Sequence, residues 1–218
     1  MKEFLRIGLL LLAALFVTTG CQEDEGESTD ALPFSPYVDA FTTGKVSRTT
    51  PVYLILNQDV AGEKMTPAVL SKAMKIKPEV KGDFEFDNAH TIVFRPTGEF
   101  ERDKQYSISA DLSQLFEDVS DTDKNFTFKF STLPISLRGN LESMSVNTAN
   151  ESTYDFVVNL YTADSETPET VESLVKISEN GTLSWVHSDD GKKHILKIEG
   201  VAGGKKVKTM EVSVGANK

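Results

Sequence analysis

The chain has 218 residues, of which 39% are hydrophobic and 26% charged. Its length suffices for one large domain or for two domains of about 100 residues each. The formal net charge of −10 argues against nucleic acid and anionic lipid surfaces as partners, because both attract a basic protein face.

Residues 1–20 have the order of a secretory signal peptide. Lys2 and Arg6 give a positive start, residues 7–17 form an unbroken run of apolar residues and glycine, and small residues lead up to Cys21. The apolar run is too short to span a bilayer, which needs about 20 such residues. The segment therefore predicts export of the chain.

The end of the signal peptide resembles a bacterial lipoprotein lipobox, in which a peptidase cuts before the cysteine and the cysteine is then acylated. Thr18 departs from the leucine that the family usually has three positions before the cysteine. The resemblance implies cleavage between Gly20 and Cys21, acylation of Cys21 with chains such as palmitate, and a membrane as partner through this anchor. Because Cys21 is the only cysteine, it cannot form a disulfide within the chain, and the alternative is a free thiol.

Residues 21–35 are predicted to be a tether without fixed structure. Residues 22–30 are acidic or small and contain no aromatic side chain, so they cannot bury enough apolar surface to fold. One interpretation is a solvated spacer. The acidic stretch also resembles the surface-export signal of Bacteroidetes lipoproteins, which implies a lipid-anchored protein of the bacterial cell envelope, exposed at the outer membrane.

Residues 36–134 predict a first β-sandwich. Thr66 and Pro67 open a short helix, because threonine caps a helix and proline suits its first turn. A further helical turn is expected at residues 112–116. Short alternating apolar segments predict the strands, at residues 51–57, 82–86, 91–96, 106–110 and 126–131.

Residues 135–218 repeat the element order of the first half and predict a second β-sandwich. Thr66 and Pro67 recur as Thr167 and Pro168, and a final strand is expected at residues 206–214. A period near 100 residues implies tandem copies of one domain, each with one short helix, joined near Pro134. Further matches pair Phe84 with Trp185 and His90 with His194.

No catalytic or metal-binding constellation is recognisable, so we expect neither an enzyme nor a cofactor. His90, His187 and His194 lack metal-binding spacing, and His90 and His194 are expected in turns that precede a strand. Ser188 and Asp189 follow His187 directly, but adjacent residues cannot adopt the geometry of a catalytic triad.

Two weaker patterns concern ligands. Residues 121–132 begin like a calcium loop, but Phe126 and Thr132 stand where that loop needs glycine and glutamate. Trp185 is the candidate aromatic contact for a ligand such as a glycan, although aromatic residues at alternating strand positions more often belong to the core.

Residues 41–51, the helix that follows and the run at residues 91–96 resemble the bacterial Ig-like domain that opens large alpha-2-macroglobulin-like surface lipoproteins of Bacteroidetes. The resemblance covers residues 37–132. It implies that the sandwiches are Ig-like and that the chain is the non-enzymatic, membrane-proximal stalk of a longer protease-trapping protein. Its partners would be downstream macroglobulin domains and host or competitor proteases. Many members carry a Cys-x-Glu-Gln thioester, which this sequence lacks.

Two functions stay open at this point. The first is a stalk of two Ig-like β-sandwich domains in a mainly β protein, and the second is a self-contained surface lipoprotein that binds a glycan or a partner protein. An exposed aromatic patch around Trp185 would favour the second function, whereas buried rings would favour the first.

Overall fold

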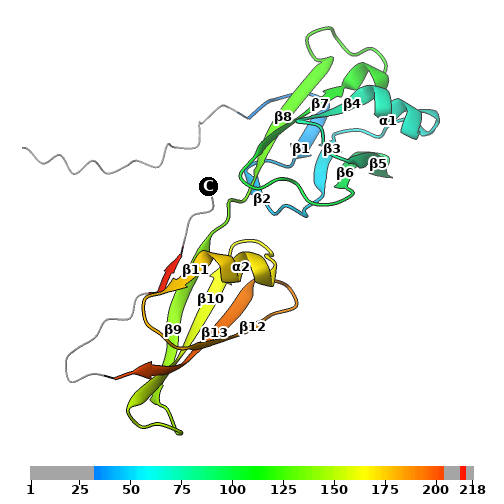
Figure 1. Ribbon diagram of the computed structural model, residues 1–218. Helices are drawn as coiled ribbons and strands as arrows, with labels where there is room; N and C mark the ends of the chain where they lie inside the picture. The colour runs from blue at the N-terminus through cyan, green and yellow to red at the C-terminus, as the bar shows by residue number, and fades with distance from the viewer. Residues whose placement is uncertain (1–31, 204–211, 215–218) are drawn as a thin grey trace, which may run out of the picture. The chain divides into compact units, whose positions relative to one another are not determined.

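The computed structural model describes residues 32–203 and 212–214. The described chain is mainly β and forms two tandem Ig-like β-sandwich domains, each with one short α-helix, as predicted (Figure 1). The signal peptide, Gly20, Cys21 and residues 21–31 of the predicted tether lie outside the described residues. At the end of that tether, Ser35 is buried and accepts a hydrogen bond from the Tyr37 amide. Residue 35 therefore already packs against the first domain.

The first domain has two facing sheets. The strands of one sheet are β1 (Val38–Phe41), β3 (Val52–Leu56), β5 (Gly82–Asn88) and β6 (Thr91–Pro96). Those of the other are β2 (Lys45–Val46), β4 (Met74–Lys77), β7 (Gln105–Asp111) and β8 (Asn125–Thr132). Their orders are β1-β3-β6-β5 and β2-β8-β7-β4, and β2 pairs with β8 in parallel whereas the other pairs are antiparallel.

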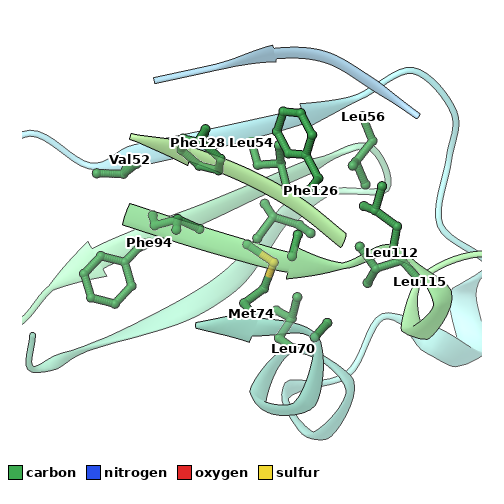
Figure 2. Packing of buried hydrophobic residues seen from close by; sticks show 14 of the residues in the cluster. Val52, Leu54, Leu56, Leu70, Met74, Phe94, Leu112, Leu115, Phe126 and Phe128 are labelled. Atoms are coloured by element: carbon green, nitrogen blue, oxygen red, sulfur yellow. The ribbon is translucent and has the colours of Figure 1, made fainter. Parts of the chain in front are cut away.

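Alternation along the strands fills the core between these sheets. Val52, Leu54 and Leu56 point inward from β3, and three buried phenylalanines followed by the buried Thr132 occupy alternate positions of β8. Side chains from both sheets and from the helix end meet in this core (Figure 2). Because successive strand residues face opposite sides, the period of two in the sequence was sufficient to predict these inward faces.

Capping threonines begin both helices, α1 (Pro67–Ala73) and α2 (Pro168–Leu174). The Thr66 hydroxyl accepts a hydrogen bond from the Val69 amide, and the Thr167 hydroxyl accepts one from the Thr170 amide. Two short 3₁₀ turns, η1 (Gly62–Lys64) and η2 (Leu112–Gln114), lie in the first domain. The predicted helices and the predicted turn at residues 112–116 are thus confirmed. None of the helices in the described part of the chain is long and apolar enough to cross a membrane.

The main sheet of the second domain repeats the strand order of the first. This sheet contains β9 (Leu137–Val146), β10 (Thr153–Thr162), β12 (Thr182–His187) and β13 (Lys193–Ala202). The order β9-β10-β13-β12 corresponds to β1-β3-β6-β5. After α2, β11 (Val175–Ile177) pairs antiparallel with β14 (Val212–Val214), as β4 pairs with β7 after α1. The predicted repeat is therefore visible in the strand order.

Strand register places the aromatic residues that the predicted repeat pairs. Trp185 lies opposite Leu196 in the second domain, and Phe84 lies opposite Phe94 in the first. The match of Trp185 with Phe84 stays a prediction. The longer turn between β12 and β13 changes the spacing along the chain.

The prediction that His194 lies in a turn was wrong. His90 does precede β6 and is exposed, but His194 is the second residue of β13 and is fully buried. It lies opposite His187 of β12 and Leu160 of β10. The pairing of β12 with β13 already includes His194, whereas β6 begins one residue after His90. His194 is therefore part of a strand, and His90 lies in the turn.

Candidate functional site

Four charged side chains connect the first domain to the segment that precedes α2. Arg48 and Arg102 come from the first domain, and Asp164 and Glu166 come from the second. The two acids are only 4% and 5% exposed, although acidic side chains are rarely buried without a partner. The described residues from Pro33 onward belong to one compact unit. We call Ser47, Arg48, Arg102, Asp164 and Glu166 the ionic joint.

Asp164 is held by three hydrogen bonds. Its Oδ1 accepts from the Ser47 hydroxyl at 2.6 Å and from the Ser165 amide at 2.9 Å, and its Oδ2 accepts from the Arg48 amide at 2.8 Å. The Arg48 Nε atom lies 3.7 Å from Asp164 Oδ2. Burial alone would raise the pKa of Asp164, but these hydrogen bonds and the Arg48 charge outweigh it and hold the pKa below its usual value.

Glu166 is paired with both arginines. Its Oε2 accepts a hydrogen bond from Arg102 Nη2 and lies 3.7 Å from Arg48 Nη2. Arg48 also donates to the Ser165 carbonyl at 3.0 Å and to Glu99 Oε2 at 2.6 Å. Within the joint, the two arginines thus balance the two buried acids in charge, and Glu99 adds a half-exposed negative charge beside Arg48.

A glycine turn supports the acidic segment of the joint. The Glu166 amide donates to the carbonyl oxygen of Gly191 at 2.9 Å, and Gly191 has a φ of +64° in the turn between β12 and β13. A Cβ atom at this position would lie 2.6 Å from Ser165 Oγ and 2.8 Å from the Glu166 carbonyl oxygen. Glycine is therefore required both for the left-handed backbone and for the close approach.

A pair of histidines lies on the core face of β12 and β13. The Nδ1 atoms of His187 and His194 are 2.8 Å apart, and His187 Nε2 lies 3.1 Å from Glu172 Oε1. His194 Nε2 is buried without a hydrogen-bond partner. Burial, followed by the charge of His187, lowers the pKa of His194. The buried His194 ring is therefore harder to protonate than a free imidazole.

These histidines do not form a metal centre. No group of three or more histidine, cysteine, aspartate or glutamate side chains in residues 32–203 has the arrangement of a metal site. In the segment that begins like a calcium loop, Asp123 accepts a hydrogen bond from Ser120 at 2.7 Å. Its carboxylate is thus engaged within the turn.

Trp185, the candidate ligand contact, packs against the core of its own domain. Its side chain is partly buried against the second core cluster. Its ring also stacks on His187 with a centroid distance of 5.7 Å and an interplanar angle of 11°. A ring that is covered on one face by a histidine and bordered by core residues does not form an open stacking platform for a sugar.

A shallow pocket of about 370 Å³ lies in the first domain. It adjoins the joint through Glu99, the exposed partner of Arg48. The other polar groups of the lining do not place a nucleophile beside a base, so the pocket assigns no reaction. Its lining consists of Glu79, Val80, Lys81, Thr97, Gly98, Glu99, Glu101 and Tyr106.

No sequence pattern predicted the ionic joint. Arg48 and Asp164 are 116 positions apart, and no local pattern marks either residue as buried. Asp164 and Glu166 lie three positions and one position before the capping threonine of α2, where the first domain has Glu63 and Met65. Only Glu166 thus departs from the repeat, at the place where the two domains interact.

No protein-family model and no curated protein matches the sequence. Solved structures that match include L,D-transpeptidase 3 from Mycobacterium tuberculosis in complex with a faropenem-derived adduct, at 12% identity and a TM-score of 0.34 over 73% of both chains. Another is an L,D-transpeptidase from Mycobacterium smegmatis, at 13% identity and a TM-score of 0.32 over 81% of this chain and 76% of that one. A third is the N-terminal part of the bacterial S-layer protein SbsC, at 13% identity and a TM-score of 0.30 over 84% and 45%. At TM-scores this low, the similarities carry no argument about activity.

Proposed function

We propose that this chain is a non-catalytic lipoprotein of the bacterial cell envelope whose two Ig-like domains form a stalk at the outer membrane surface. Cys21 carries the lipid, and residues 22–30 separate the lipid from the first domain. The stalk would present downstream macroglobulin domains, as in the alpha-2-macroglobulin-like protease inhibitors that the sequence resembles.

The ionic joint is the observation that carries this proposal. A flexible pair of domains would be connected by solvated residues, but here Asp164 and Glu166 are buried against Arg48 and Arg102. Separating such a pair is costly where one charge stays buried without its partner. The connection between β8 and β9 spans only residues 133–136 and contains Pro134, which also limits its freedom.

A spacer function is tested by the width of an interdomain distance distribution. We would label Asp83→Cys and Lys197→Cys in the full chain carrying Cys21→Ser, because both positions are exposed strand residues. Pulsed electron spin resonance should give one narrow distance peak, which should broaden when Arg48→Ala is added. A broad distribution in the chain with an intact joint would overturn the stalk.

Lipidation is tested separately, by metabolic labelling with an alkyne analogue of palmitate. The unchanged chain should incorporate the label and Cys21→Ser should not, whereas Ser28→Ala in the tether should leave labelling intact. Equal labelling of the unchanged chain and Cys21→Ser would refute the assignment of the anchor.

An immunoblot of native cells, with antibody against residues 36–134, measures the mass of the natural protein. A much heavier band supports the macroglobulin context.

A self-contained binding protein is the second candidate function. The observation that favours it is a row of exposed apolar side chains on β9, namely Leu141, Met144 and Val146. Large exposed apolar side chains in a row are typical of interaction surfaces. A native mass near that of the chain, together with a ligand captured by this row, would favour this function over the stalk.

A further inference from the structure

The second sheet of the second domain has an unpaired edge. In the first domain, β7 pairs with β4 on one side and with β8 on the other. Its counterpart β14 pairs with β11, and no other strand within residues 32–203 and 212–214 pairs with it. An unpaired edge offers backbone N–H and C=O groups to an added strand. The position that β8 occupies in the first domain is thus open among the described strands of the second.

In the first domain, β8 does more than extend the sheet. Phe126 and Phe128 cover Phe41 of β1, with ring centroids 5.4 and 5.2 Å apart. Together with Phe130, they supply three buried rings at alternate positions of one strand. Strand β8 therefore makes backbone hydrogen bonds to β7 and at the same time covers an apolar side chain of β1.

Strand register shows which side of β9 Leu141 occupies. Phe41 lies opposite Leu54 of β3, and Leu141 lies opposite Val158 of β10. Leu54 and Val158 are both buried core residues. Leu141 of the edge strand β9 therefore lies on the core side of its sheet, as Phe41 does on the edge strand β1.

Leu141 and its neighbours on β9 remain uncovered. Leu141, Met144 and Val146 are 57%, 58% and 50% exposed, and we call them the β9 row. Met144 lies opposite Phe156, which packs against the second core cluster. Directly opposed residues of antiparallel strands point to the same side of a sheet, so the β9 row belongs to the core face rather than to the outer face.

We propose that the second domain binds an extended segment of a partner polypeptide, which adds antiparallel to β14 and covers the β9 row. The partner segment carries bulky apolar side chains at alternate positions, as β8 does. Main-chain hydrogen bonds to an open sheet edge, with alternate side chains in apolar sites, are a recurring mode of peptide recognition. The open edge and the uncovered row point to the same occupant.

Within the described chain, the strand with this pattern is already in use. Strand β8 is paired with β7 on one side and with β2 on the other, and its three phenylalanines are buried. A second copy could donate β8 only if its own first domain unfolded. This argues against β8 of a second copy as the occupant.

The test measures binding of a labelled peptide with the sequence of residues 124–133, which contains β8, to the full chain in lipid nanodiscs. The control peptide has the same composition, with the three phenylalanines placed next to one another so that alternation is lost. Fluorescence anisotropy should show binding about tenfold tighter for the alternating peptide. Hydrogen exchange should show new protection of the amides of residues 212–214.

Two variants locate the apolar site. Leu141→Ser should weaken binding of the alternating peptide by about tenfold. Val186→Ser is the matched control, since Val186 is 53% exposed and lies opposite Ile195 on the other face of the same sheet, and it should leave binding unchanged. Thermal unfolding of both variants checks that they retain the fold.

Three results would overturn the proposal. One is equal or absent binding of the two peptides, and another is protection of β7 rather than β14, which would mean exchange into the first domain. The third is self-association of the chain without peptide that Leu141→Ser abolishes. In that case a second copy covers the β9 row.

Discussion

At the scale of single residues, burial separates the ion pairs of this chain into two classes. Arg95 and Glu85 lie 3.6 Å apart with side chains 46% and 58% exposed, whereas Arg48 and Asp164 are 11% and 4% exposed. An exposed pair contributes about 0–1 kcal/mol because water and salt screen it. Removing one partner of a buried pair costs about 3–5 kcal/mol, since the other charge is left uncompensated.

We therefore expect a strong coupling between Arg48 and Asp164. Arg48→Met and Asp164→Leu should each lower the free energy of unfolding by about 3 kcal/mol or more, and the double variant should lose less than the sum. Urea unfolding of the unchanged chain, the two single variants and the double variant gives the coupling energy. The cycle of Arg95→Met and Glu85→Leu is the control and should give about 0–1 kcal/mol. Equal coupling in both cycles would contradict a buried joint.

The paired histidines predict a loss of stability in mild acid. Because burial and His187 lower the pKa of His194 in the folded chain, the unfolded chain binds a proton that the folded chain does not. The stabilisation is present above the unfolded value of about 6.5 and is lost as the pH falls below it, with a slope of at most about 1.4 kcal/mol per pH unit.

Urea unfolding at pH 7.5 and 5.5 measures this effect. His194→Gln removes the titrating group and should reduce the difference between the two pH values. Leu196→Val, two positions along β13, should lower stability at both pH values without changing that difference. An unchanged pH dependence in His194→Gln would show that His194 does not cause it.

At the scale of elements, the helices were predictable, and strands β1 and β9 show why some strands were not. The helices follow from a local signal, threonine before proline, which acts through hydrogen bonds within one turn. Strands β1 and β9 each contain a register shift against their neighbour. In β9 this shift places Leu141 and Ser143 opposite consecutive residues of β10. A bulge of this kind breaks the period of two on which strand prediction depends.

The two capping threonines should contribute equally to their own helices. Thr66→Ala and Thr167→Ala each remove the acceptor for an amide of the first turn, and each should lower the free energy of unfolding by about 1 kcal/mol. Thr66→Ser and Thr167→Ser keep the hydroxyl and should lose much less. Urea unfolding followed by circular dichroism compares the four variants, and equal losses for alanine and serine would exclude the cap as the cause.

At the scale of the whole molecule, the two domains have unequal cores. In the described residues, the first core cluster contains 19 buried side chains and the second contains five. Buried apolar area is the main source of stability. Strand alternation made the first core predictable. The second core is smaller because the sheet that faces its main sheet has only two described strands and because the β9 row is exposed. Both depend on contacts between distant parts of the chain, which local periodicity does not report.

Trp185 can report this difference directly, because it is the only tryptophan in the chain and packs against the second core cluster. In increasing urea, its emission should shift to longer wavelength before the far-ultraviolet circular dichroism signal is lost, since the smaller core unfolds first. Asp164→Asn should separate the two transitions further, because the ionic joint couples the second domain to the first. Trp185→Phe is the control that removes the emission signal and should leave the later transition in place. Coincident transitions in the unchanged chain would mean that the joint makes both domains unfold as one unit.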